Sequence, residues 1–393
     1  MELRPGFKKT DVGLIPEDWD VVSVGNLADF TSGKGISIAA LHGQSSDFPV
    51  PVFGGNGIAG YTTTALVRGP SVVVGRVGQK CGEVYLVDGP AWITDNALYP
   101  RSISRPLDVR FLALALEAAG LNNVKNRNDL PLVTQSILQA VRIAWPPAVP
   151  EQHAIAGALG DLDALLAALT RLIAKKRDLK QAAMQQLLTG QTRLPGFKGE
   201  WKVKRLGDVA EIVSGGTPRT SIPSYWDGGV KWCTPTDITG TAGKYLSETE
   251  RTISQAGLDS CSAQLLPAGT LLLCSRATIG ELKIAGCEVC TNQGFKSLIA
   301  RKDVNNEYLY YLLQTMKPRM VEKAIGSTFL EISKKDTASL EVSLPAFNEQ
   351  VAIAAVLSDM DAELAALERR LAKTRAVKQG MMQELLTGRT RLV

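Results

Sequence analysis

One long stretch of this sequence occurs twice. Residues 151–194 and 349–392 align at a constant offset of 198 without a gap, and 28 of the 44 paired positions are identical. Repetition at this level comes before any other feature, because it fixes how many units the chain is built from. Two near-copies so far apart predict a molecule with quasi-twofold symmetry.

Both copies have the pattern of a long helix. Apolar residues step by 3, 4, 3 and 4, which gives the narrow seam of a coiled coil, at Leu159, Leu162, Leu166, Leu169, Ile173, Leu357, Met360, Leu364, Leu367 and Leu371. Asn348 is a candidate N-cap of the second copy, and Gly190 and Gly388 stand where helix-ending glycines are expected. About 38 helical residues would span roughly 57 Å.

A helix with a single apolar seam needs a partner that covers the seam. We expect the two copies to pair with each other as an antiparallel coiled coil, because their seams match. The alternative is that each helix packs only on its own globular domain.

Composition limits the class of protein. The chain has 393 residues, of which 45% are hydrophobic, so two or three domains with real cores are expected. No apolar run approaches the roughly 18 residues of a membrane span, and the N-terminus lacks the apolar core of a signal peptide. Six irregularly spaced cysteines do not suggest a disulfide framework, so a reducing cytoplasm is expected.

The net charge of +5 is modest for a chain of 393 residues. It divides into 0, +2, +2 and +1 over residues 1–150, 151–194, 195–347 and 348–393. Such a chain is no bulk polycation. Nucleic-acid binding would therefore depend on local basic patches or on a basic partner.

The repeat extends beyond the helices. The sequence PGFK at 5–8 recurs at 195–198, and Trp19 and Gly33 recur as Trp201 and Gly215 at an offset of 182. The second PGFK directly follows the first helix copy, whereas the first stands at the N-terminus as though it continued from residue 392. The order of repeats is therefore circular, which predicts that the two termini lie close in space.

Two globular segments, about 10–146 and 201–345, lie between these landmarks. Each reads as short strands separated by Gly, Pro, Asn and Thr, with a helix near its end. The strand at 71–76 is matched to 271–276, which pairs Arg76 with Arg276, and residues 94–96 are matched to 291–293. The second segment is longer, and the extra residues are expected mostly between Gly35 and Pro51 in the first segment's terms.

These features predict four parts. Residues 1–146 and 195–345 form two α/β (α+β) recognition domains, and residues 147–194 and 346–393 form the two helices that separate them. The helices are nearly identical, whereas the loops of the domains differ. We therefore expect the two domains to share one function but to act on two different targets.

Local motifs resemble those of the specificity subunits of Type I restriction-modification systems. The first domain contains PVFGGNGIAGY at 51–61 and GPAWITDN at 89–96. The second contains SGGTP at 214–218, then Tyr225-Trp226 and WCTPTD at 232–237. SGGTP alone is a weak signal. The order of the motifs, together with the paired helices, is specific, and the resemblance covers nearly the whole chain.

This resemblance implies a non-catalytic, DNA-binding subunit of a methyltransferase and endonuclease complex. Each recognition domain would read one half of a bipartite double-stranded DNA target. Two methyltransferase subunits would dock on the helices, and up to two restriction and translocase subunits would join them. S-adenosylmethionine (AdoMet), ATP and Mg²⁺ would be bound by those partners, with no cofactor in this chain.

The residues themselves favour a chain without catalysis. There is no GxxxxGK[ST] phosphate loop, no GxGxxG motif after a strand and no Asn/Asp-Pro-Pro-aromatic motif. His42 and His153 are the only histidines and stand in unrelated contexts. Cys287 and Cys290 form a lone CxxC without a second pair, which argues against zinc.

DNA-reading candidates are loop residues whose side chains can span base edges. Arginine can span guanine O6 and N7, and Asn or Gln can span adenine N6 and N7. The candidates are Asn56, Arg76, Asn96, Arg219, Lys231, Arg276 and Gln293. The matched arginines could instead hold a shared loop or touch phosphate, and Asn56, between glycines, could instead adopt a left-handed turn.

Other readings stay open at this point. Trp226 and Trp232 are better explained as core or loop anchors than as base-stacking platforms. The basic second halves of the helices favour a solvated coiled-coil face over DNA contact. Alternative functions are the recognition subunit of a system with a fused methylase-nuclease, and a scaffold or binding protein that does not act on DNA.

Overall fold

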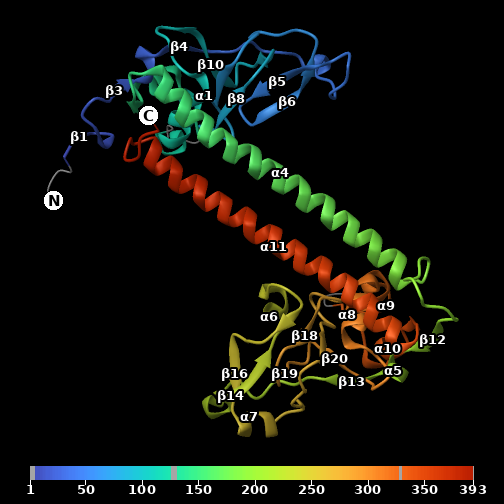
Figure 1. Ribbon diagram of the computed structural model, residues 1–393. Coiled ribbons are helices and arrows are strands. Elements are labelled where there is room, and N and C mark those ends of the chain that lie inside the picture. The colour runs from blue at the N-terminus through green and yellow to red at the C-terminus, as the bar shows by residue number, and fades with distance from the viewer. Residues whose placement is uncertain (1–4, 125–130, 327–329, 393) are drawn as a thin grey trace. The chain divides into compact units, whose positions relative to one another are not determined.

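The computed structural model describes residues 5–124, 131–326 and 330–392. The chain forms two compact units: residues 1–169 with 371–393, and residues 170–370. The two longest helices, α4 (Val149–Leu188) and α11 (Phe347–Leu385), each contribute to both units (Figure 1). The finer four-part division made from the sequence stays a prediction.

The helices end as the sequence predicts but begin differently. Gly190 and Gly388 follow the last turns and have φ of +72° and +67°, the left-handed conformation that glycine adopts without a steric penalty. Helix α11 begins at Phe347, so the expectation that Asn348 caps it is wrong. The first helical hydrogen bonds go to Ala346, whose carbonyl accepts from the N–H groups of Glu349 and Gln350 at 2.9 and 3.1 Å.

In each unit one part of α4 lies antiparallel to one part of α11. Asp163 pairs with Lys378 at 2.7 Å in the first unit, and Lys176 pairs with Glu363 at 2.7 Å in the second. The antiparallel pairing predicted from the seams is therefore confirmed. All ten predicted seam residues are buried or half-buried. The register places residues 159–169 beside the end of α11. The two predicted seams therefore face each other over only part of their length.

The first unit is built on a four-stranded sheet of order β4-β10-β7-β8, and α1 packs against β7 and β8. Smaller sheets are β6-β5-β9, β11-β3 and β1-β2. The helices are α1 (Val109–Ala118), α2 (Leu121–Val124) and α3 (Gln135–Ala140). The strands are β1 (Phe7–Thr10), β2 (Gly13–Pro16), β3 (Asp20–Ser23), β4 (Ala28–Ser32), β5 (Val50–Gly54), β6 (Gly57–Thr62), β7 (Ser71–Gly75), β8 (Val84–Val87), β9 (Trp92–Ile93), β10 (Ala97–Ile103) and β11 (Arg142–Trp145).

The second unit repeats this plan with one strand more in its main sheet. Its main sheet has the order β13-β20-β17-β18-β15, and the smaller sheets are β16-β14-β19 and β12-β21. The helices are α5 (Leu206–Val209), α6 (Pro235–Gly240), α7 (Gln255–Asp259), α8 (Asn306–Thr315), α9 (Lys317–Lys323) and α10 (Lys334–Ala338). The strands are β12 (Lys202–Arg205), β13 (Ala210–Ser214), β14 (Trp226–Cys233), β15 (Tyr245–Leu246), β16 (Arg251–Ile253), β17 (Leu271–Leu273), β18 (Leu282–Ala285), β19 (Cys290–Thr291), β20 (Lys296–Ala300) and β21 (Glu341–Leu344).

The extra residues of the second unit do not lie where the sequence comparison placed them. Phe53 pairs with Ile93 in the first unit as Cys233 pairs with Thr291 in the second. The two units are therefore still aligned, without an insertion in the second, just after Pro51. The insertion comes next: β5 and β6 are joined by a tight turn, whereas the connection from β14 to β16 contains α6 and β15. The expectation that the extra residues lie between Gly35 and Pro51 is therefore wrong.

Two of the sequence matches are wrong by one residue. The N–H of Arg76 donates to Asn96 O at 3.0 Å, and the equivalent bond runs from Ser275 to Gly294 at 2.7 Å. Arg76 therefore corresponds to Ser275, and residues 94–96 correspond to 292–294. The loop between the strand and the following glycine is one residue shorter in the second unit, which sequence comparison alone could not place.

The circular order of the repeats closes within the first unit. Arg391 donates to both carboxylate oxygens of Glu151, and to Asp18 at 3.0 and 3.1 Å. The N-terminal and C-terminal segments therefore meet, as the sequence predicts. The equivalent bond in the second unit runs from Arg193 to Glu349. Both glutamates are almost fully buried, with side chains 2% and 1% exposed.

We expect Arg391→Ala to destabilise the first unit by about 3 kcal/mol, because it leaves the buried Glu151 carboxylate without its cation. Urea unfolding measures the loss. Arg389→Ala is the control, since its pair with Glu384 is half-exposed and 3.7 Å long, and it should cost less than about 1 kcal/mol. Equal effects of the two variants would contradict this role of Glu151.

Candidate nucleic-acid interface

Four loop segments meet in the first unit: 33–35, 54–57, 75–80 and 93–96. Backbone hydrogen bonds hold them together, from Lys34 to Ile93 O at 2.9 Å and from Thr94 to Phe53 O at 2.8 Å. Gly33 permits this approach, because a Cβ there would lie 2.1 Å from the carbonyl oxygen of Ile93. We call these segments the first loop cluster.

The second unit contains an equivalent cluster of segments 215–219, 233–235, 275–281 and 291–294. Gly216 N–H donates to Thr291 O at 2.9 Å, and Asn292 N–H donates to Cys233 O at 3.1 Å. Gly215 is again required, since its Cβ would lie 2.1 Å from Asn292 O. The backbone of this second loop cluster repeats the first, whereas most side chains differ.

Three of the predicted DNA-reading residues are held by their own domain. Arg76 donates to Ser32 Oγ at 3.0 Å. Arg276 binds Glu331 at 2.6 Å, and Lys231 binds Glu248 at 3.0 Å and the Ser247 carbonyl. These partners favour the scaffold interpretation of the three cations over base reading.

Two more candidates support a loop. Asn56 Oδ1 accepts from the N–H of Lys80 at 3.1 Å and joins two segments of the first cluster. Its φ is not positive, so the left-handed interpretation is wrong; the neighbouring Gly57 has the positive φ, +95°. Gln293 Oε1 accepts from the Thr217 hydroxyl in the second cluster.

Asn96 and Arg219 remain available for a ligand. Both are exposed, and within the described residues no side-chain hydrogen bond or ion pair ties either one. The backbone N–H of Asn96 is bound to Thr94 Oγ1 at 3.3 Å, and the Arg219 carbonyl accepts from Trp226 Nε1 at 3.3 Å. Their main chains are therefore held in place while their side chains face solvent.

Sequence reasoning missed Lys34. It is exposed on segment 33–35, where Trp92 Nε1 donates to its carbonyl oxygen at 2.9 Å. The signal was present, because Ser32-Gly33 matches Ser214-Gly215. A lysine next to this turn places a positive charge on the cluster that can contact phosphate.

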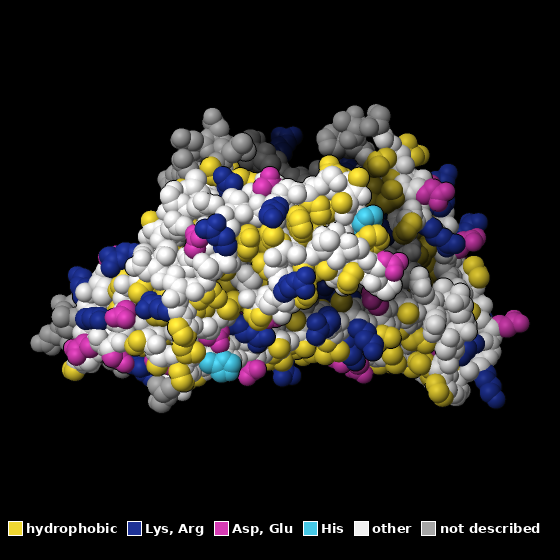
Figure 2. All heavy atoms as spheres, turned by 90° about the horizontal axis from the view of Figure 1, so that it is seen from above, with side chains coloured by type: hydrophobic (Ala, Val, Ile, Leu, Met, Phe, Trp, Pro, Cys, Tyr) yellow, Lys and Arg dark blue, Asp and Glu magenta, His cyan; other side chains and the backbone are white. Residues whose placement is uncertain are grey.

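Several cations of the long helices bind carboxylates of the other helix. Arg177 bonds Glu368 at 2.5 Å, and Lys180 bonds Asp361. Figure 2 shows Lys and Arg interspersed with Asp and Glu over the face in view. A coiled-coil face explains these cations better than a continuous DNA-binding track.

Trp226, Trp232 and the buried cysteines Cys274 and Cys290 have structural roles. Trp226 and Trp232 are 8% and 4% exposed and pack edge to face at 5.1 Å, as expected for anchors. Burial raises the pKa of the Cys274 thiol to about 11 and that of Cys290 to about 12, which disfavours the thiolate form needed for nucleophilic or metal-binding roles.

Within residues 5–124, 131–326 and 330–392, no three His, Cys, Asp or Glu residues are grouped to hold a metal. In the same residues, no helix is both long and apolar enough to cross a membrane.

Two loop clusters on a shared framework, joined by paired helices, define a two-headed recognition protein. The family model for the Type I restriction modification DNA specificity domain matches residues 16–177 and 198–374. The chain belongs to this family, and its role is DNA sequence specificity.

Relatives and solved structures agree with this assignment. The Type I restriction enzyme MjaIX specificity subunit of Methanocaldococcus jannaschii is 40% identical over 173 residues, which is 44% of this chain and 40% of that protein. The putative MjaX specificity subunit of the same organism is 24% identical, and the match covers 98% of this chain and 97% of that one.

The fold matches solved specificity subunits. A Type I restriction-modification system S subunit from M. genitalium has a TM-score of 0.67 at 17% identity, covering 98% of both chains. A chain from a structural study of type I R-M complex assembly and conformational transition has a TM-score of 0.59 at 21% identity, covering 95% of this chain and 99% of that chain. These likenesses support the two-domain α/β architecture with long helices.

Proposed function

We propose that each loop cluster reads one half of a bipartite DNA sequence. One observation carries the proposal: the same backbone cluster is built twice, with different side chains at its exposed positions. Asn96 corresponds to Gly294, and Asp95 corresponds to Gln293. A shared framework presents both clusters to the same kind of ligand, and different exposed side chains give each half-site its own sequence.

The chain contributes recognition, and its partners contribute chemistry. Methyltransferase subunits dock on the helices and bind AdoMet, and restriction subunits that bind ATP and Mg²⁺ can join them. Support comes from the repeated ends of the helices. Gln379, Met382 and Gln383 of α11 recur in α4 as Gln181, Met184 and Gln185.

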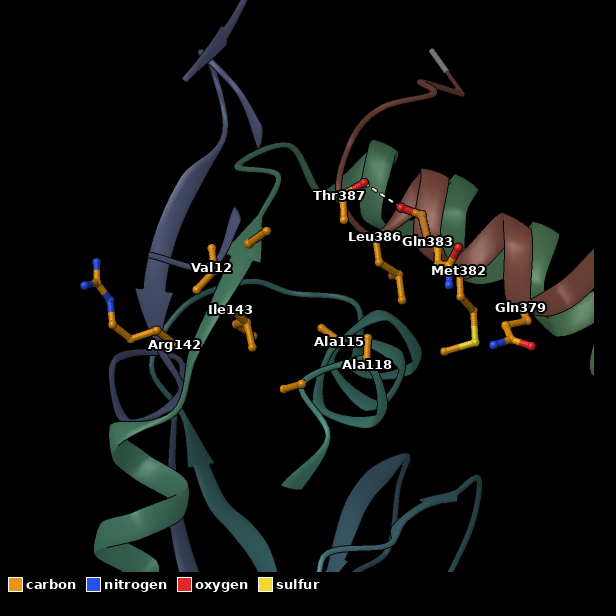
Figure 3. A pocket seen from close by; sticks show the side chains of 12 residues that line it. Val12, Ala115, Ala118, Arg142, Ile143, Gln379, Met382, Gln383, Leu386 and Thr387 are labelled. Atoms are coloured by element: carbon orange, nitrogen blue, oxygen red, sulfur yellow. Dashed lines mark hydrogen bonds between the residues drawn. The ribbon is translucent and has the colours of Figure 1, made fainter. Parts of the chain in front are cut away.

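The end of α11 is hollowed beside these repeated residues. Figure 3 shows Met382 of α11 and Leu386, which directly follows that helix, together with Ala115 of α1 and Ile143 of β11 around a cavity of about 330 Å³. Small side chains on α1 leave this apolar space open, because Ala119 stands where the second unit has the buried Met316. Such a hollow suits an apolar side chain of a docked subunit.

Single substitutions test the loop clusters as readers of DNA. We expect Asn96→Ala to relax one half-site and Arg219→Ala to relax only the other, each by about 1–3 kcal/mol of base discrimination, or roughly 5- to 150-fold. Gel-shift titration of the full chain with its methyltransferase against a random DNA pool measures the preference. Asn26→Ala, exposed but outside both clusters, should change nothing. Retention of the full preference in both cluster variants would exclude these residues as readers, and a wild-type chain that enriches no sequence would refute DNA recognition.

Stoichiometry tests the helices as docking sites. Because the two helix ends repeat, we expect a monomer of this chain to bind two identical methyltransferase subunits. Native mass spectrometry of the reconstituted complex checks this. A stable one-to-one complex that takes up no second methyltransferase would contradict the prediction.

A further inference from the structure

The main sheets of the two units differ at one edge. In the second unit, β15 covers the outer edge of β18 as a parallel strand. In the first unit β8 is the edge strand, and no described strand pairs with its outer side. Leu86 of β8 is 37% exposed there. An exposed apolar edge strand offers unpaired N–H and C=O groups to another chain.

The covered edge of β18 shows which backbone N–H groups are available on the open edge of β8. Ile284 N–H donates to Lys244 O at 2.8 Å, and Gly286 N–H donates to Leu246 O at 2.7 Å. Ile284 opposes Leu271 as Leu86 opposes Val72, so Leu86 and Asp88 hold the equivalent donors. Both point away from β7, toward the open side of the sheet.

The side chains that accompany β15 also have no counterpart in the first unit. Lys244 Nζ bonds Glu307 at 2.9 Å and Ser358 at 2.7 Å, and the Tyr245 hydroxyl bonds Glu307. Tyr311 fills the neighbouring space and donates to Asp361 at 2.6 Å. In the second unit this region is therefore closed by groups of the chain itself.

The same region of the first unit is a cavity of about 270 Å³ lined by residues of β8, α1 and α4. Leu114 stands at the position of Tyr311, and Gly160 at that of Ser358, so the bulky and hydrogen-bonding groups are missing. The lining also includes Leu86 and Arg110; Arg110 replaces Glu307 and pairs with Asp88 at 3.1 Å. The cavity therefore lies directly beside the open strand edge.

We propose that β8 takes an extended segment of the methyltransferase subunit as a fifth, parallel strand, one of whose bulky apolar or aromatic side chains fills the cavity. This rests on the proposed function, which supplies the partner. Strand addition at a sheet edge is a general way to bind an extended peptide.

This contact can form in the first unit only. Two methyltransferase copies that dock on near-identical helix ends therefore meet two different domains: the first accepts a strand, and the second is closed by β15. The first copy gains an attachment that the second copy lacks.

Hydrogen–deuterium exchange of the full chain, alone and with its methyltransferase, tests the inference. We expect exchange of residues 84–88 to slow at least about tenfold in the complex, while residues 282–286 are protected in both states. Leu86→Pro removes the N–H and should weaken the added attachment about tenfold, whereas Leu86→Thr keeps the N–H and the protection.

The outcomes separate this inference from the proposed function. If the complex forms and methylates DNA but residues 84–88 exchange as in the free chain, the strand contact is wrong and the function stands. Protection without methyltransferase that rises with chain concentration would assign the edge to a second copy and overturn the proposal. Failure of the wild-type chain to bind any methyltransferase would refute the proposed function and this inference with it. The exchange measurement on the wild-type complex decides the matter even if Leu86→Pro does not fold.

Discussion

Replacing residues 201–345 with the equivalent domain of another family member is expected to change one half of the methylated DNA motif completely and leave the other half intact. The reason is that each loop cluster is assembled within its own unit. The bonds from Gly216 to Thr291 and from Asn292 to Cys233 use no group of the first unit. Mapping methylated adenines across a genome measures both halves at once.

A second domain exchange uses only segments of this chain. Residues 19–146 placed instead of 201–345 should give an inverted repeat of the first half-site, because both frameworks present their loops on equivalent strands. The matched control carries the second domain of this chain in both positions and should give an inverted repeat of the other half. A change in both halves after a single domain exchange would contradict independent reading.

Four residues inserted at opposite points of the two long helices are expected to lengthen the unread spacer of the motif by one or two base pairs. Each helix grows by about 6 Å and turns by roughly 400°, close to a whole turn, so the seam is nearly restored. One DNA turn of 10–10.5 base pairs is about 34–36 Å, which sets the size of the change. The register identifies opposite points after Leu169 and after Leu371, since Asp163 pairs with Lys378 and Lys176 with Glu363.

A two-residue insertion at the same points is the control. It rotates the seam by about 200°, turns the apolar side of each helix to solvent and should abolish methylation. A four-residue variant that folds and methylates the original spacing unchanged would contradict the prediction that the length of the helices sets the spacing. The spacing would then be set by the methyltransferase partners.

Much of the architecture could be predicted because it depends on long regular patterns. The seam repeat predicted two paired helices, and the circular order of PGFK and helix predicted that the chain ends meet, which the bonds of Arg391 to Glu151 and Asp18 confirm. The helical pattern extends over about eleven turns in each helix, so a one-residue error at an end such as Asn348 does not affect it.

The loops were harder because their alignment depends on hydrogen bonds between distant segments. Arg76 and Arg276 look equivalent in sequence, yet the strand bonds pair Arg76 with Ser275. The insertion that carries β15 could not be placed either, since its flanks share no motif. Which cations are free also depends on partners far along the chain: Glu331 holds Arg276, whereas Arg219 is left exposed.

The most direct test of the central claim is to sequence DNA methylated by the reconstituted complex of this chain with its methyltransferase, at single-molecule resolution. Two reading heads predict a bipartite motif with two different halves separated by a fixed unread spacer, and one methylated adenine in each half. A single contiguous motif, or methylation whose sequence preference persists without this chain, would contradict it.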